Sequence, residues 1–155
     1  KSIWPKLMRI RSWPMLLPHY ERLSNLDFEC FGKSRWTHGN IRGLFENLNL
    51  TIILDFEEEK LVGFIAFSAI PPESELLKIG VQSDHRRRSV GKRLIGKMIV
   101  TLLEQGSVEK IFLEVRSDNR PAISFYETLN FRKTGLRKNY YTHPAADAVL
   151  LIREL

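Results

Sequence analysis

Hydrophobic residues recur along this chain of 155 residues with two different spacings, which predict alternating strands and helices. Short apolar runs predict strands at 7–11, 50–56, 61–70, 75–81, 108–115, 131–141 and 148–153. Helical spacing predicts helices over 14–28, 37–48, 90–105 and 121–129. In the helix over 90–105 the apolar positions fall on one face, which we expect to pack on a sheet.

Turn and cap residues mark the ends of these elements. Pro18 predicts an irregularity within the first helix, and Thr37, which follows Trp36, is a good N-cap for the second. The acidic run 57–60 predicts a solvated hairpin tip, and the prolines at 71–72 close the strand after it. With no repeat, low-complexity tract or linker, we expect one domain over 1–155. Its class is α/β, with the antiparallel half of a mixed sheet first and crossover units later.

Composition excludes several other classes of protein. Hydrophobic residues make up 43% and charged residues 27%, as in ordinary globular proteins. No apolar run approaches the ~18 residues of a membrane span, and no signal-peptide core follows the basic start. Cys30 is the only cysteine, so we expect no intrachain disulfide, a cytoplasmic location and a small buried side chain. The histidines lack ligand spacing, so we expect no metal site.

The net charge of +6 is concentrated in one basic cluster. A basic patch attracts nucleic acid, an acidic membrane or a polyanionic cofactor, and charge alone does not choose among them. The cluster contains Arg86, Arg87, Arg88, Lys92, Arg93 and Lys97.

This cluster surrounds a predicted junction between a strand and a helix, at 82–91. The first turn of such a helix has unpaired N–H groups that attract phosphate, and Gly91 lets the backbone approach closely. The loop lacks the glycine spacing of a Walker A loop or a dinucleotide fingerprint, so nucleotide hydrolysis and hydride transfer lose their main support. Taken alone, an arginine run here is more often a solvated basic face.

The spacing Arg86-x-x-Ser89-x-Gly91 resembles the Gln/Arg-x-x-Gly-x-Gly/Ala pyrophosphate loop of the GCN5-related N-acetyltransferase (GNAT) superfamily, which binds acetyl-coenzyme A. The resemblance implies a mixed, mostly antiparallel central sheet with helices on both faces. It implies that the coenzyme's pyrophosphate is held by Arg86, Arg87, Arg88, Ser89, Val90, Gly91 and Lys92.

The same resemblance assigns the preceding strand to the pantetheine arm of the coenzyme. The backbone of Ile79 and Val81 would contact that arm, and Gly80 would lie at a β-bulge. Ser89 departs from the family, which usually has glycine there. Serine keeps its N–H and offers a hydroxyl that could cap the helix, but it restricts the backbone and crowds the ligand.

Residues 112–141 carry a more specific resemblance, to the ribosomal-protein-alanine N-acetyltransferases, and it extends over about 61–154. It rests on Leu113-Glu114-Val115-Arg116, Asn119, Phe125-Tyr126-Glu127 and Asn139-Tyr140-Tyr141. Asn130 stands where the family generally has glycine, and asparagine tolerates the left-handed conformation of a helix end.

The resemblance implies that Glu114 is the general base, Tyr126 the general acid, and Asn119 a hydrogen-bonding partner of the coenzyme. An ammonium group must lose a proton before it attacks a thioester, and a carboxylate can accept that proton. An α-amino group, with a pKa of ~8, is deprotonated more easily than lysine at ~10.4. Taken singly, Glu114 is more often an exposed strand residue, and Tyr126 a helix residue packed on the sheet.

Three aromatic residues are candidates for contact with the acceptor. Tyr140 and Tyr141 correspond to the family's paired tyrosines near the substrate groove, although packing alone also explains them. Trp36 beside Phe31 would form an apolar wall for the first residues of the acceptor, or a hydrophobic staple for the second helix.

Together these features predict a monomeric acetyltransferase that transfers acetyl groups directly from acetyl-CoA, without Cys30 as a nucleophile. The expected acceptor is a protein N-terminus, including that of a ribosomal protein; we expect no membrane partner, and nucleic acid only indirectly through the ribosome. Two alternatives stay open. One is a small-amine or lysine acetyltransferase on the same fold; the other is a non-catalytic module that senses coenzyme A or binds RNA.

Overall fold

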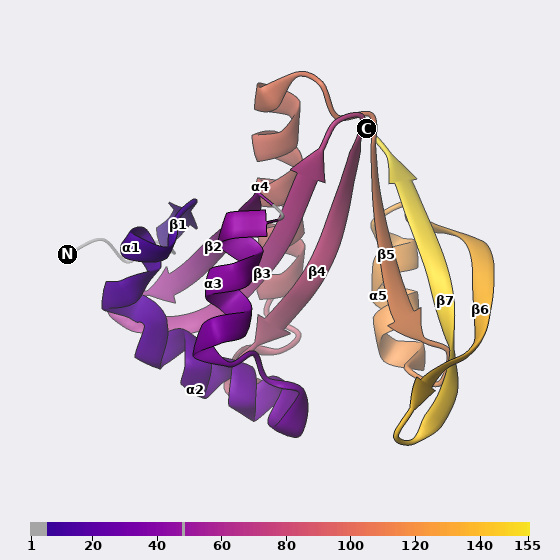
Figure 1. The fold of residues 1–155 in the computed structure, drawn as a ribbon, viewed down its shortest axis with the longest axis horizontal. Coiled ribbons are helices and arrows are strands. Elements are labelled where there is room, and N and C mark those ends of the chain that lie inside the picture. Colours follow the sequence, from indigo (N-terminus) through magenta and orange to yellow (C-terminus); the bar gives the residue numbers. More distant parts are fainter. Residues whose placement is uncertain (1–5, 48) are drawn as a thin grey trace.

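The computed structural model describes residues 6–47 and 49–155, which contain a mixed sheet of seven strands (Figure 1). The strand order is β1-β2-β3-β4-β5-β7-β6, and β4 and β5 are the parallel pair. The bounds are β1 Lys6–Ile10, β2 Leu50–Glu57, β3 Lys60–Ile70, β4 Glu73–Val81, β5 Lys110–Arg116, β6 Arg132–Thr142 and β7 Ala145–Glu154. The predicted class, a mostly antiparallel α/β sheet, is confirmed.

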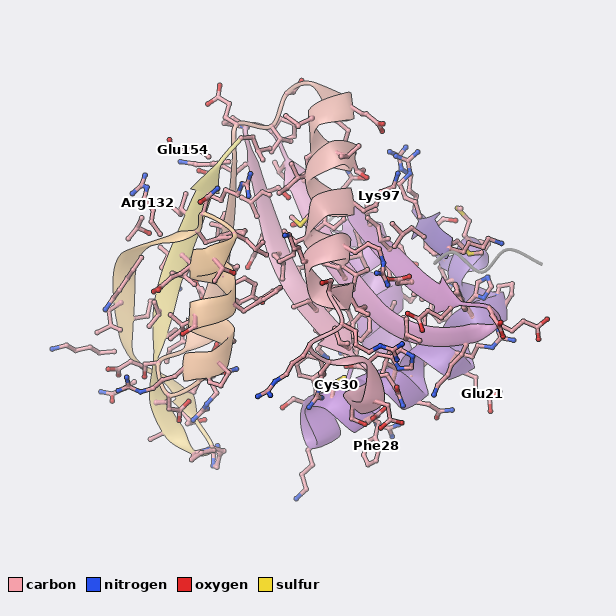
Figure 2. The ribbon with its side chains drawn as sticks, turned by 180° about the vertical axis from the view of Figure 1, so that it is seen from behind. Glu21, Phe28, Cys30, Lys97, Arg132 and Glu154 are labelled. Carbon is pink, nitrogen blue, oxygen red and sulfur yellow. The ribbon has the colours of Figure 1, made fainter. Side chains whose placement is uncertain are left out.

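Helices cover both faces of the sheet. One face carries α1 (Trp13–Leu16), α2 (Tyr20–Phe31) and α3 (His38–Asn47), and the opposite face carries α4 (Val90–Gln105) and α5 (Arg120–Thr128). Figure 2, drawn from behind, shows α4 and α5 in front of the strands, with the Arg132–Glu154 ion pair at the outer edge of β6 and β7.

The predicted helix over 14–28 is divided by a 3-10 turn, Leu17–His19, at the irregularity that Pro18 predicts. Proline lacks the N–H that a continuous helix would need here, and its ring restricts the preceding residue. The helix then continues to Phe31, three residues past the predicted end, and Gly32 stops it with a φ of +54°.

Thr37 begins α3 as predicted. Its Oγ1 accepts from the N–H of Asn40 at 3.2 Å, and the Oδ1 of Asn40 accepts from the N–H of Thr37 at 2.9 Å. The two side chains thus satisfy two backbone donors reciprocally. Leu48, the last residue of the predicted helix, lies outside the described residues.

The core has two layers because the side chains of the central strands alternate between the faces. On β3, Phe67 packs with α4 residues such as Leu94 and Met98. Phe64 and Ala66 pack instead with the helices of the other face. Leu61–Ile70 is therefore a nearly continuous apolar run, as expected of a strand covered on both sides.

The course of β4 differs from the prediction in one detail. Ala66 pairs with Lys78 and Phe67 with Leu76, so the extra residue of the β-bulge is Leu77. Gly80, which we expected at the bulge, instead pairs regularly with Phe64. A Cβ at position 80 would lie 2.6 Å from Phe64 Cε1, so glycine is needed there for close packing rather than for a bulge.

After β5 the chain does not add a second parallel strand. Helix α5 leads to β6 at the sheet edge, and β7 returns between β5 and β6, antiparallel to both. Only the β4–α4–β5 connection is therefore a parallel crossover among the described elements. Asn130, just after α5, has a φ of +67°, the left-handed conformation expected for it.

Candidate active site

The central feature of the site is a gap between β4 and β5. The two strands pair over only three positions, from Glu73 with Lys110 to Glu75 with Phe112, and then diverge (Figure 1). Beyond Glu75, no strand of the described residues pairs with this edge of β4. Backbone groups along the remainder of β4 are therefore open to another partner.

The amides of Ile79 and Val81 face this gap. The N–H of Gln82 bonds Val62 O on β3, at 2.9 Å, and Gly80 pairs with Phe64 on β3. Because alternate residues of a strand direct their backbone groups to opposite edges, Ile79 and Val81 point away from β3. The carbonyl of Val81 already accepts from Arg86 Nε at 3.3 Å. The two N–H groups and the carbonyl of Ile79 are the groups that a ligand in the gap could meet.

The predicted anion loop leads from β4 into α4. In α4 the first intrahelical bond runs from Arg93 N to Ser89 O, so the amides of Val90, Gly91 and Lys92 have no partner within the helix. Ser89 has a φ of +64° and a ψ of +15°, a left-handed conformation, and Arg87 has a φ of +62°. The serine hydroxyl makes no capping bond, although the sequence allowed one. A left-handed Ser89 directs its side chain differently from an ordinary N-cap, which has extended backbone.

The basic cluster divides into structural and exposed members. Arg93 contacts the buried carboxylate of Asp55 at 2.8 Å and Glu57 at 3.9 Å, and it therefore anchors the helix rather than facing solvent. Burial raises the pKa of Asp55, and Arg93 opposes that rise. Arg87, Arg88 and Lys92 are exposed beside the unpaired amides and remain available to an anion.

We expected the whole acidic run 57–60 to be a solvated hairpin tip, but Glu57 does not belong to one. Its carboxylate contacts His85 Nε2 at 2.9 Å, in the short 3-10 turn Ser83–His85. Together with Arg93, this contact joins the β2–β3 hairpin to the anion loop. Glu58 and Glu59 are exposed, as predicted.

Gly91 packs against the other side of the gap. A Cβ at this position would lie 3.0 Å from Phe125 Cζ, on α5. The start of α4 and the middle of α5 thus approach each other on the face of the sheet that α4 and α5 share. A bulky residue at position 91 would displace Phe125 as well as any ligand, so Lys92 is the cleaner position for testing anion binding.

Glu114 and Tyr126 lie on opposite faces of the sheet. Leu113 and Val115 enter the core under α4 and α5, so Glu114 between them faces the side of α2. Its side chain is 16% exposed and forms an ion pair with Arg137 of β6, whose Nε lies 3.1 Å from a carboxylate oxygen. Tyr126 lies within the α4–α5 layer, edge-on to Phe131.

Burial alone raises the pKa of Tyr126 to about 12, with no hydrogen bond offsetting it. The phenol is therefore protonated throughout the neutral range. It can donate a proton to a stronger base formed beside it, which is what the predicted acid must do.

Glu75 is a further carboxylate of the site that the sequence analysis missed. Leu76 enters the α4 layer, so Glu75 faces the side of α2, as Glu114 does. Burial and then the charge of Glu114 raise the pKa of Glu75, while Arg137 lowers it. The strand β4 carries Glu75 and β5 carries Glu114, so the two carboxylates lie on either side of the start of the gap. A glutamate near a strand end is too common to have signalled this role.

Asn119 is the N-cap of α5. Its Oδ1 accepts from the N–H of Ala122 at 3.3 Å, which occupies the side-chain oxygen and leaves the amide NH2 group as its free donor.

The candidate acceptor residues lie on two segments. Tyr140 is half exposed and packs edge-on against Tyr141, which in turn stacks on Arg116 at 4.9 Å. Burial and then the charge of Glu114 raise the pKa of Tyr141, which places this ring in the field of the predicted base. Trp36 and Phe31 both contact the ammonium of Lys78, each with its ring centre at 4.5 Å.

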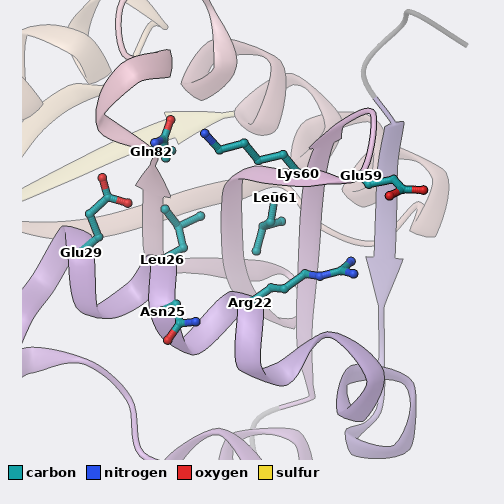
Figure 3. A pocket seen from close by; sticks show the side chains of 8 residues that line it. All are labelled: Arg22, Asn25, Leu26, Glu29, Glu59, Lys60, Leu61 and Gln82. Atoms are coloured by element: carbon teal, nitrogen blue, oxygen red, sulfur yellow. The ribbon is translucent and has the colours of Figure 1, made fainter.

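Two other features are a cysteine beside β4 and a surface hollow. Cys30 is half-buried and its Sγ donates to Val81 O at 3.5 Å; burial raises the pKa of its thiol, which disfavours the nucleophilic thiolate. An open hollow between α2 and the β2–β3 hairpin is lined mostly by charged and polar residues, including Arg22, Glu29 and Lys60 (Figure 3). It contains none of the predicted site residues.

Within residues 6–47 and 49–155, no three His, Cys, Asp or Glu side chains are grouped as a metal site would require. Across the same residues, no helix is long and apolar enough to cross a membrane.

The mixed sheet thus divides between its two parallel strands, with an anion loop at one side of the gap and a carboxylate at the other. The sequence model of the acetyltransferase (GNAT) family matches residues 10–131, and the chain belongs to this family. The predicted resemblance to the GNAT superfamily is therefore confirmed.

Curated relatives agree with the more specific resemblance. The chain is 34% identical over 94 residues to the [ribosomal protein bS18]-alanine N-acetyltransferase of Escherichia coli K12, a match that covers 59% of this chain and 63% of that protein. It is 36% identical over 98 residues to the N-alpha-acetyltransferase RimI of Mycobacterium tuberculosis, covering 61% and 60%. The chain thus spans less than two thirds of the length of these relatives.

Solved structures confirm the fold. The ribosomal-protein-S18-alanine N-acetyltransferase of E. coli superposes with a TM-score of 0.83 at 22% identity, over 97% of this chain and 94% of that one. The Arabidopsis thaliana NAA60 complex with acetyl-CoA has a TM-score of 0.77 at 18% identity, over 97% and 99%.

Proposed function

We propose that this protein transfers an acetyl group from acetyl-CoA to the α-amino group of a protein N-terminus. The observation that carries the proposal is the gap between β4 and β5, which has free backbone amides along one side and a carboxylate on the other. The relatives named as alanine N-acetyltransferases support the choice of acceptor. The complex of NAA60 with acetyl-CoA supports the choice of donor.

The residues of the loop and of β4 would hold the donor. The unpaired amides of Val90, Gly91 and Lys92 suit the pyrophosphate, and exposed Arg87 and Arg88 add opposing charge. The amides of Ile79 and Val81 suit an extended amide-containing arm laid along β4 like an added strand. One of these N–H groups would also polarise the thioester carbonyl.

Glu114 and Tyr126 would then divide the proton transfers between the two faces of the sheet. Glu114 accepts a proton from the acceptor ammonium, directly or through water, and the neutral nitrogen attacks the thioester carbonyl carbon. The carbon–sulfur bond breaks, and the departing thiolate takes the phenolic proton of Tyr126. The attacking nitrogen loses its second proton to solvent, and solvent returns a proton to the Tyr126 phenolate. The positions of the base on the α2 side and the acid on the α5 side suit an acceptor and a donor that meet within the gap.

Glu75 gives the acceptor subsite a second carboxylate, and Arg137 a competing cation. An incoming ammonium that approaches Glu114 must share or replace the contact with Arg137 Nε. That pair is partly exposed, with Arg137 60% accessible, so exchange with a substrate cation is physically reasonable.

The test is release of coenzyme A thiol from acetyl-CoA with a panel of acceptors. The panel contains short peptides with free N-termini, including Ala-first sequences, together with an N-blocked lysine peptide and polyamines. Turnover confined to free N-termini is expected. Turnover on lysine or polyamines alone would instead establish the open alternative of a side-chain or small-amine acetyltransferase.

Glu114→Gln should lower kcat strongly near neutral pH while leaving the Kd of acetyl-CoA nearly unchanged. Glu104→Gln is the matched control, because Glu104 is an exposed carboxylate on α4 with only a distant contact to Arg9, at 3.9 Å. Normal turnover by the Glu114 variant would reject the base assignment. Acetyl-CoA binding without turnover on any acceptor would favour a non-catalytic module that senses coenzyme A. RNA binding that weakens steeply with salt would favour a non-catalytic module that binds RNA.

A further inference from the structure

Lys78 is buried on β4 in a cage of charged and aromatic groups. Its Nζ donates to Asp27 Oδ1 at 2.7 Å, and the two side chains are only 9% and 1% exposed. The rings of Phe31 and Trp36 lie on the same ammonium, each with its centre at 4.5 Å. We call these four residues the Lys78 clamp.

The clamp also holds the backbone of the segment 32–37, which connects α2 to α3. Lys78 Nζ donates to the carbonyl of Ser34 at 3.0 Å, and the second oxygen of Asp27 accepts from the N–H of Trp36 at 2.7 Å. Charged hydrogen bonds of this length are about twice as strong as neutral ones. The connecting segment is therefore fixed at two backbone points, Ser34 to Lys78 on β4 and Trp36 to Asp27 on α2, and its Trp36 ring lies on the ammonium of Lys78.

The β-bulge at Leu77 explains why a lysine faces this side of the sheet. The bulge adds a residue to β4, so Leu77 and Lys78 both turn toward α2. Three residues before Lys78, Glu75 faces the same side, and the next residue, Ile79, directs its amide into the gap. The clamp thus lies directly beside the proposed acceptor subsite.

Figure 1 shows the end of α2 and the β6–β7 turn on either side of the open end of the gap. We expect a protein N-terminus that reaches Glu114 from the α2 side to enter between these segments. Tyr140 and Tyr141 lie at the end of β6, just before this turn, and Trp36 lies on the segment 32–37 that follows α2, where the Lys78 clamp holds it in place.

We propose that the Lys78 clamp sets the acceptor specificity of the enzyme by fixing segment 32–37 as one wall of the entrance for the acceptor. This inference rests on the proposed function. Stability alone is a poor explanation of the clamp, because a buried ion pair is often no more stabilising than apolar residues of the same volume. What the pair adds is directional contact to Ser34 and Trp36.

The deciding variant is the double substitution Asp27→Asn with Lys78→Met. It removes both charges together, so neither is left buried alone, and the amide introduced at position 27 still offers an oxygen to the N–H of Trp36. It deletes only what the ammonium supplies, namely the bond to Ser34 and the contacts to the two rings. Steady-state kinetics are measured with acetyl-CoA and Ala-first or Leu-first hexapeptides, together with the melting temperature.

The expected result is a rise of about tenfold in the KM for the Ala-first peptide, from the lost cation–π and hydrogen-bond contacts. Selectivity between the two peptides should fall, while the Kd of acetyl-CoA and the melting temperature stay near those of the wild type. Lys78→Arg in the presence of Asp27 keeps the charge and should restore part of the selectivity.

The matched control is Asp55→Asn with Arg93→Met, the corresponding neutralisation of the ion pair beneath the anion loop. It should weaken acetyl-CoA binding and leave peptide selectivity unchanged. The inference is overturned if the folded Lys78 double variant keeps the wild-type peptide KM and selectivity, or if it loses only acetyl-CoA affinity. A wild-type protein that acetylates no N-terminus would reject the proposed function, and the role of the clamp with it.

Discussion

Replacing Ser89 by glycine tests whether the anion loop is strained. Ser89 has a φ of +64°, where an L side chain costs roughly 1–2 kcal/mol and glycine almost nothing. Its hydroxyl makes no capping bond, so the substitution deletes no hydrogen bond of the helix end. Glycine adds freedom to the unfolded chain, which offsets about 0.4–1 kcal/mol. We expect Ser89→Gly to be more stable by about 0.5–1 kcal/mol, a rise in Tm of about 1–4 °C.

Thermal unfolding followed by circular dichroism measures this effect, and Arg88→Gly is the control. Arg88 is a neighbour in the same loop but is not in the left-handed region, so glycine there should lower the Tm. Opposite signs for the two variants are the expected result. A Tm for Ser89→Gly that falls, or that shifts in the same direction as that of Arg88→Gly, would refute the strain argument. Calorimetry should also find acetyl-CoA binding at least as tight as in the wild type, because the smaller residue leaves the loop more room.

Three further predictions address the catalytic pair, the second carboxylate and the packing of β4. Tyr126→Phe should lower kcat by about 100-fold or more with little change in Tm, and an unchanged kcat would make Tyr126 purely structural. Glu75→Gln should be more stable than the wild type at neutral pH. Burial and the charge of Glu114 raise the pKa of Glu75, so the folded protein binds the proton of this carboxyl more tightly than the unfolded chain does. The wild type therefore loses stability as the pH rises through that pKa. The difference in unfolding free energy between this variant and the wild type should vanish toward about pH 3, which urea unfolding at neutral pH and at about pH 3 measures. A difference independent of pH would contradict the reasoning. Gly80→Ala should lose about 1–3 kcal/mol in urea unfolding, because the new Cβ would lie 2.6 Å from Phe64 Cε1, and wild-type stability would show that this ring moves freely.

The elements were predictable where the signal is local. The apolar face of 90–105 gave the bounds of α4 correctly, and Thr37 gave the start of α3 because an N-cap bond spans only three residues. Pro18 likewise marked the break in the first helix. The failures concern contacts between distant parts of the chain. Glu57 belongs to an ion-pair network only because the fold brings His85 and Arg93 to it.

In the candidate site, too, local sequence signals were informative and contacts between distant residues were not predictable. The family resemblance predicted Glu114 and Tyr126 as base and acid, yet it could not show that Arg137 contacts Glu114 or that the two groups lie on opposite faces of the sheet. Both facts depend on how β5 pairs with β7 and on where α5 packs, and neither is encoded in a short motif.

The β-bulge at Leu77 could not be predicted from the hydrophobic pattern, and it determines which face of the sheet Lys78 occupies. If residues 76, 77 and 78 alternated strictly, with no bulge, Lys78 would fall on the same face as Leu76, against the apolar layer of α4. The bulge instead turns Lys78 toward Asp27, 51 positions earlier in the sequence, and leaves Ile79 and Val81 directed into the gap. The bulge that takes up Leu77 thus keeps both the coenzyme-facing backbone and the clamp beside the acceptor on their present sides of β4.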